Sequence, residues 1–130
     1  MIFKHAISWF EIPSTDINRA QKFYETIFDI KMTAMDMPQL QMRMFPTESR
    51  IDVGGAITYQ PDYYKPAGEA GVVVYLNANP NVQIVLDRIE GAGGKIIIPK
   101  TEISPDHGHM AVFMDSEGNR IALHSVPGSM

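Results

Sequence analysis

The chain has 130 residues, of which 45% are hydrophobic and 20% are charged, so it has enough apolar material for a core and is neither disordered nor fibrous. Its 11 Lys and Arg residues and 15 Asp and Glu residues give a net charge of −4, which argues against a nucleic-acid partner. It has no cysteine, which excludes disulfides, thiolate nucleophiles, cysteine-bound zinc and iron–sulfur clusters.

The first half of the chain predicts the order strand, helix, strand, strand, strand. The expected elements cover, in turn, residues 2–12, 17–28, 30–36, 39–45 and 51–59. Pro13 ends the first strand because proline cannot donate to a central ladder, and Ser14 or Thr15 is a natural cap for the following helix. In the last of these strands, Gly54 and Gly55 predict a bulge or a close approach of another backbone segment.

After a linker rich in proline and glycine at residues 60–69, the second half repeats this order. The expected elements cover residues 71–77, 80–90, 95–100, 109–115 and 120–126, followed by a loose tail over 127–130. Asn79 is the expected cap of the second helix, with Pro80 at its first position. Gly118 is expected to adopt positive φ in the turn before the last strand.

Each half, about residues 1–62 and 68–130, is too short to bury a sheet and a helix alone, so we expect one domain over 1–130. The repeated order predicts an α+β fold in which two βαβββ modules pair into a curved eight-stranded sheet, with helices outside and a cleft inside. Such a cleft suits a small-molecule ligand. No apolar run is near the roughly 18–20 residues that span a bilayer, and residues 1–7 lack the order of a signal peptide. We therefore expect a cytoplasmic protein with no membrane partner.

Four segments give the chain its resemblance to a known family. They are WFEIP at 9–13, DINRAQKFY at 16–24, GAGGK at 91–95 and DSEGNRIALHS at 115–125. With these segments in this order, the chain resembles the vicinal oxygen chelate superfamily, which includes glyoxalase I, bleomycin-resistance proteins and extradiol dioxygenases. It is most similar to the enzymes described as related to lactoylglutathione lyase. The resemblance spans nearly the whole chain and implies a homodimer.

Metal-dependent members of that superfamily have His, Gln or Glu at four positions, in the first and last strands of each half. The resemblance places these positions at Ile7 or Ser8, at Ala56, at Val72 or Val74, and at Ala122. Ile, Ala and Val have no oxygen, nitrogen or thiolate donor for a divalent metal. The sequence therefore predicts no metal and no cofactor, which puts glyoxalase and dioxygenase chemistry in doubt.

We expect a ligand in the cleft to contact a mostly apolar set of side chains. These are Ile7, Trp9, Met42, Met44, Ala56, Val72, Ala122 and His124. Trp9 could stack on a ligand or be buried against the helix, and the methionines could also be ordinary core filling. His124 and His109 are the candidate acid/base residues, against the alternatives of hydrogen-bonded strand residues or a relocated metal site.

Three functions follow from these expectations. The leading hypothesis is metal-free binding of an aromatic or planar small molecule, with no catalysis required. The second is a lyase or isomerase of glyoxalase type that acts on a small carbonyl or thioester-like substrate, with His124 or His109 as general base or with a displaced metal. The third is a structural role in which the edges of the sheet bind another protein.

Overall fold

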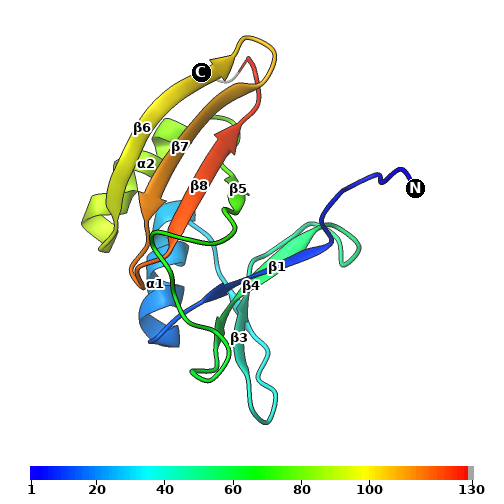
Figure 1. Cartoon of the computed structure of the whole chain (residues 1–130), viewed down its shortest axis with the longest axis vertical. Coiled ribbons are helices and arrows are strands. Elements are labelled where there is room, and N and C mark those ends of the chain that lie inside the picture. Colours follow the sequence, from blue (N-terminus) through cyan, green and yellow to red (C-terminus); the bar gives the residue numbers. More distant parts are fainter. Residues whose placement is uncertain (129–130) are drawn as a thin grey trace.

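The computed structural model describes residues 1–128. This part of the chain contains two helices and eight strands (Figure 1). In chain order they are β1 (Trp9–Pro13), α1 (Ile17–Phe28), β2 (Thr33–Ala34), β3 (Gln41–Met44), β4 (Gly54–Tyr59), β5 (Tyr75–Asn77), α2 (Val82–Ala92), β6 (Lys95–Ser104), β7 (Gly108–Met114) and β8 (Arg120–Ser125). Residues 129 and 130, the end of the expected tail, lie outside the described range. Neither helix is long and apolar enough to cross a membrane.

The strands form two four-stranded sheets with the same topology. The first sheet has the order β1-β4-β3-β2 and the second the order β5-β8-β7-β6. In each sheet the first strand of the module runs parallel to the last one, and the remaining pairs are antiparallel. The α+β class and the two βαβββ modules are thereby confirmed.

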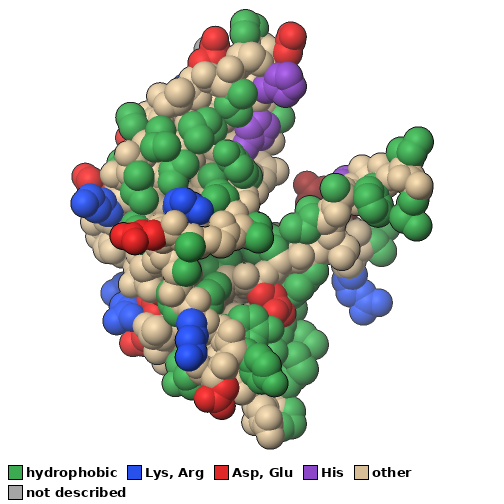
Figure 2. Space-filling model, in the orientation of Figure 1, with side chains coloured by type: hydrophobic (Ala, Val, Ile, Leu, Met, Phe, Trp, Pro, Cys, Tyr) green, Lys and Arg blue, Asp and Glu red, His purple; other side chains and the backbone are tan. Residues whose placement is uncertain are grey.

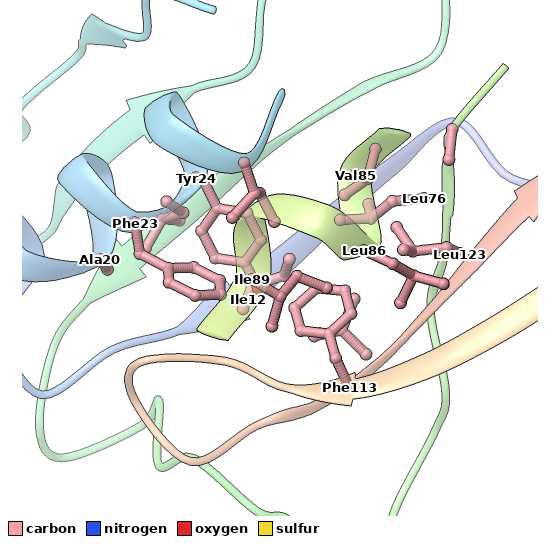
Figure 3. Packing of buried hydrophobic residues seen from close by; sticks show 14 of the residues in the cluster. Ile12, Ala20, Phe23, Tyr24, Leu76, Val85, Leu86, Ile89, Phe113 and Leu123 are labelled. Carbon is pink, nitrogen blue, oxygen red and sulfur yellow. The ribbon is translucent and has the colours of Figure 1, made fainter. Parts of the chain in front are cut away.

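The two modules meet through their helices, which pack against each other (Figure 1). Each helix buries one apolar face, as the spacing of its apolar residues predicts, and these faces join one core with side chains from both sheets (Figure 3). The buried helix residues are Ile17, Ala20, Phe23, Tyr24 and Ile27 of α1 and Val82, Val85, Leu86 and Ile89 of α2. The helices therefore lie inside, between the sheets, and not outside as expected.

The first strand is shorter than predicted. It begins at Trp9, and the preceding residues are exposed and outside any strand. The reason lies in its partner: β4 begins at Gly54, which pairs with Trp9, so residues 2–8 have no β4 residue to pair with. The apolar residues Ile2, Phe3 and Ile7 predicted a strand over this segment, and the structure does not form one there.

Both helix caps lie further along the chain than predicted. Asp16, rather than Ser14 or Thr15, caps α1, and Asn81, rather than Asn79, caps α2. The Asp16 Oδ1 accepts from the backbone N–H three residues on at 3.1 Å, and the Asn81 Oδ1 accepts from the N–H two residues on at 2.9 Å. The displaced candidates instead form hydrogen bonds to other elements.

Pro99 does not end β6 as expected, since the strand continues to Ser104. The pairing with β7 shifts register between Ile98 and Thr101, on either side of the proline. β6 is also the edge of its sheet. Proline has no backbone N–H to donate. At the edge of the sheet and at a register shift, its presence therefore costs no hydrogen bond of the β-ladder.

Gly54 and Gly55 correspond neither to a bulge, because their pairing with Trp9 and Phe10 is regular, nor to a close approach of backbone, because side-chain atoms are their nearest neighbours. A Cβ on Gly55 would lie 2.4 Å from the Phe10 ring. A Cβ on Gly54 would lie 3.4 Å from the Trp9 ring. The two glycines thus make room for one aromatic ring on each face of the sheet.

Glu117, in the turn between β7 and β8, connects the second module to the first. Its carboxylate accepts hydrogen bonds from the backbone N–H groups of Thr15 and Asp16, both at 2.9 Å, and from Arg19 Nε at 2.7 Å. These groups surround the N-terminus of α1, where negative charge is favoured. Although burial opposes the charged form, these hydrogen bonds hold the pKa of Glu117 at about 2.

Candidate functional site

The face of the first sheet that points away from the helices carries side chains from three strands. Glu11 of β1 pairs with Ala56 of β4, which pairs with Met44 of β3. Side chains alternate along a strand, and the neighbouring Phe10 and Ile57 belong to the core side. The first open face, as we call it, consists of Trp9, Glu11, Met42, Met44, Ala56 and Thr58.

Glu11 is held at the centre of a small polar cluster on this face. Its carboxylate accepts one hydrogen bond from the Tyr64 hydroxyl and one from Trp9 Nε1, the latter at 3.2 Å. The hydrogen bond to Glu11 also raises the pKa of Tyr64. The sequence did not predict this cluster, because Tyr64 belongs to the linker and nothing in the sequence places it beside β1.

The second sheet has a corresponding face. Ala122 of β8 lies between Tyr75 of β5 and Val112 of β7, and His124 lies between Asn77 and Met110 in the next row. Figure 2 shows hydrophobic side chains spread over this sheet, with histidines near one edge. The second open face consists of Tyr75, Asn77, Met110, Val112, Arg120, Ala122 and His124.

The two candidate histidines lie on opposite faces of the second sheet. His124 shares the open face with Ala122, as predicted. His109 pairs with Ser125 and shares the core side with Ala111, and its buried Nδ1 has no hydrogen-bond partner among the described residues. The two rings therefore cannot act together on one ligand over the open face.

The tautomer of His124 is determined by its neighbour. Its Nε2 lies 2.7 Å from the carbonyl oxygen of His107. A carbonyl can only accept, so Nε2 carries the proton and the neutral ring keeps its lone pair on Nδ1. Any proton that His124 takes up must therefore arrive at Nδ1.

The other predicted contact residues are placed differently. Trp9, Met42, Met44 and Ala56 are brought together on the first open face. Ile7 lies in the exposed segment before β1, and Val72 lies before β5 with 90% of its surface exposed. The alternative Val74 packs against the core. Ala56 and Ala122 are fully buried, so a ligand would contact the side chains around them.

One chain does not bring the two open faces together. Among the described residues, no strand of the first sheet packs alongside a strand of the second. The predicted contact residues are thus divided between two surfaces, with Trp9 and Tyr75 still 41% and 55% exposed. The cleft expected from the sequence is incomplete within a single protomer.

The residues at the four expected metal positions do not fit a divalent ion. The side chains of Ile7, Ala56, Val72 and Ala122 have no donor atoms, and of the alternatives Ser8 and Val74 only Ser8 has an oxygen. Across residues 1–128, no three His, Cys, Asp or Glu side chains are grouped so that they could hold a metal. The carboxylate and imidazole that do lie on the open faces belong to different sheets. We therefore derive no chemical step through a metal.

A cavity that the sequence did not predict lies between the two modules, on the core side of the first sheet. Its volume is about 460 Å³, within the range of small-molecule sites. It is lined by Phe10, Phe28, Ile30, Phe45, Pro46, Thr47, Val53, Gly54, Gly55, Leu76, Asn77 and Asn79. The only indication of this cavity in the sequence is the three phenylalanines among its lining residues. Phenylalanine at these core-facing positions is equally expected in a hydrophobic core without a cavity.

Comparison with known proteins identifies related chains. The sequence profile of the Glyoxalase/Bleomycin resistance protein/Dioxygenase superfamily matches residues 6–123. A glyoxylase-like domain-containing protein from Didymella fabae is 27% identical over 98% of this chain and 99% of its own length.

Solved structures share the fold. Glyoxalase I from Zea mays is similar over 91% of this chain with a TM-score of 0.68 and 21% identity, and this chain spans only 45% of its length. A glyoxalase/bleomycin resistance protein/dioxygenase family enzyme from Burkholderia phytofirmans is similar over 92% of this chain and 97% of its own, with a TM-score of 0.65 and 17% identity.

Proposed function

The chain belongs to the Glyoxalase/Bleomycin resistance protein/Dioxygenase superfamily, and we propose that it is a member that binds a small molecule without a metal ion. The observation on which this rests is the chemistry of the expected ligand positions: Ile7, Ala56, Val72 and Ala122 offer no donor atom. Ala56 and Ala122 instead lie beside apolar and aromatic side chains such as Trp9, Met44 and Tyr75, which favours a planar, largely apolar ligand.

The proposed site requires two copies of the chain. In one protomer Trp9 on the first open face and Tyr75 on the second remain exposed, and exposed aromatic side chains of this kind are typical of surfaces that bind a partner. A homodimer in which the first open face of one protomer meets the second open face of its partner would close the cleft. Trp9 and Met44 would then face Tyr75 and His124 across the ligand.

The alternative function is a lyase or isomerase of the kind related to lactoylglutathione lyase. One observation favours it: His124 is oriented by a hydrogen bond that leaves Nδ1 free to take up a proton from a small carbonyl substrate. It is the only candidate base on the second open face, since His109 lies on the core side.

Turnover discriminates the two functions. The hemithioacetal of methylglyoxal and glutathione is incubated with the purified chain, with and without added Ni²⁺ or Zn²⁺, beside the variants His124→Ala and His5→Ala. The binding function predicts no turnover above the uncatalysed rate in any sample. Turnover that His124→Ala abolishes and His5→Ala retains would establish the alternative, because His5 lies in the exposed segment before β1.

A further inference from the structure

The cavity between the modules, which we call the intermodule pocket, shares Asn77 with the second open face, but its aromatic walls lie on the core side of the sheets. Phe10 and Phe45 line it from the core side of the first sheet, and Leu76 lines it from the core side of β5. It is complete within one protomer, whereas the proposed cleft needs two. Its lining therefore defines a second place where a ligand could bind.

The aromatic walls of this pocket are fixed by the core behind them. Phe10 and Phe45 lie with ring centroids 5.6 Å apart, and Tyr24 packs edge-on against Phe45 at 5.5 Å and stacks on Phe28 at 6.5 Å. Tyr24 is itself fully buried, and its hydroxyl donates to Asp115 at 2.7 Å. The rings are thus held in place before any ligand arrives, which lowers the entropy cost of binding.

The floor of the pocket depends on Gly55. A Cβ there would come within 2.5 Å of three carbons of the Phe10 ring, so only glycine lets the ring lie against β4. With a larger residue the ring would have to move from its place beside the pocket. The shape of the pocket therefore depends on glycine at position 55.

The lining determines the chemistry of a ligand. Among the described residues that line the pocket, none is Lys, Arg, His, Asp or Glu, so nothing there compensates a charge. Two carboxamides lie at its edge, and their oxygens are already used: Asn77 Oδ1 accepts from Asn79 N at 2.9 Å, and Asn79 Oδ1 accepts from Val126 N at 2.7 Å. Their Nδ2 groups remain as donors for a ligand acceptor.

From these features we infer that the intermodule pocket binds a neutral, flat aromatic molecule with a carbonyl or ether oxygen at one end. The ring system lies among Phe10, Phe28 and Phe45, and the oxygen accepts from the amide of Asn77 or Asn79. Although Asn77 belongs to both this site and the second open face, the rings that would hold the ligand do not line the proposed cleft, so either site can exist without the other.

Prodan, a neutral naphthalene ketone whose emission shifts to the blue in apolar surroundings, tests the inference. Titration into the full chain is expected to give a blue shift that saturates at one probe per chain. Thr47→Trp places a ring in the pocket from its exposed edge, and Val53→Trp does so from the loop before β4. Each is expected to weaken binding about tenfold or more, equivalent to about 1.4 kcal/mol.

Two controls separate the intermodule pocket from other sites. Thr26→Trp makes the same change as Thr47→Trp at an exposed position of α1, and Tyr75→Glu places a charge on the second open face. Both are expected to bind prodan as the unmodified chain does. Absence of binding to the unmodified chain, or retention of binding by Thr47→Trp and Val53→Trp, overturns the inference. Loss in Tyr75→Glu alone would assign the probe to the open face, which also overturns it and leaves the proposed cleft intact.

Discussion

Replacement of Glu117 by Gln tests the connection between the two modules. The carboxylate of Glu117 accepts from Thr15 N, Asp16 N and Arg19 Nε, and its side chain has no exposed surface. In glutamine an NH₂ group replaces one of the two carboxylate oxygens, and this group cannot accept a hydrogen bond. At least one buried donor therefore loses its acceptor. We expect Glu117→Gln to fold and to be less stable at pH 7.

The magnitude follows from the pKa of the carboxyl group. A fall from 4.5 in the unfolded chain to about 2 in the folded one contributes about 3 kcal/mol at pH 7. Because the Arg19 side chain is 53% exposed, water screens part of this, and we expect about 2 kcal/mol. The folded pKa is the lower one, so the contribution is complete above pH 4.5 and is lost as the pH falls from 4.5 towards 2.

Urea denaturation followed by circular dichroism at pH 7 and pH 3 measures this directly. The difference in unfolding free energy between the unmodified chain and Glu117→Gln should decrease by about 1 kcal/mol from pH 7 to pH 3. Glu90→Gln, at an exposed position of α2, is the matched control and should follow the unmodified chain at both pH values. If the Glu117→Gln difference is the same at pH 7 and pH 3, the ionised carboxylate does not connect the modules and the reasoning is refuted.

Three further outcomes follow from the packing. In urea denaturation, Gly55→Ala should lower the free energy of unfolding by about 1–3 kcal/mol, because the added Cβ would lie 2.4 Å from the Phe10 ring. Gly54→Ala should lower it less, because its Cβ would lie 3.4 Å from the Trp9 ring. Tyr24→Phe should cost about 1–3 kcal/mol in the same assay, because it removes a buried hydrogen bond to Asp115. Sedimentation equilibrium should give twice the mass of the chain; the mass of one chain at all concentrations would contradict the homodimer.

The helices were predicted well and the strand ends poorly, for a physical reason. A helix makes its hydrogen bonds within itself, so its apolar spacing was enough to predict residues 17–28, the extent observed for α1. A strand extends only as far as its partner allows. Residues 2–8 include Ile2, Phe3 and Ile7 and were predicted as strand, yet no β4 residue pairs with them.

For the candidate site, the sequence predicted the position of single residues but not which residues lie close together. Strand alternation correctly placed His124 on the same face as Ala122. It could not show that His109 lies on the core side, because the start of β7 fixes that register, nor that Tyr64 of the linker donates to Glu11. The intermodule pocket is lined by Leu76 together with residues far away in sequence, and no local pattern could bring them together.

Calorimetric titration of the purified chain with Zn²⁺, Ni²⁺, Mn²⁺ and Fe²⁺ is the most direct test of a metal-free function. With alanine at positions 56 and 122, we predict no stoichiometric binding of any of these ions. Tight binding of one ion per chain, abolished by Glu11→Gln or His124→Ala, would show that donors on the open faces assemble a metal site and would contradict the account.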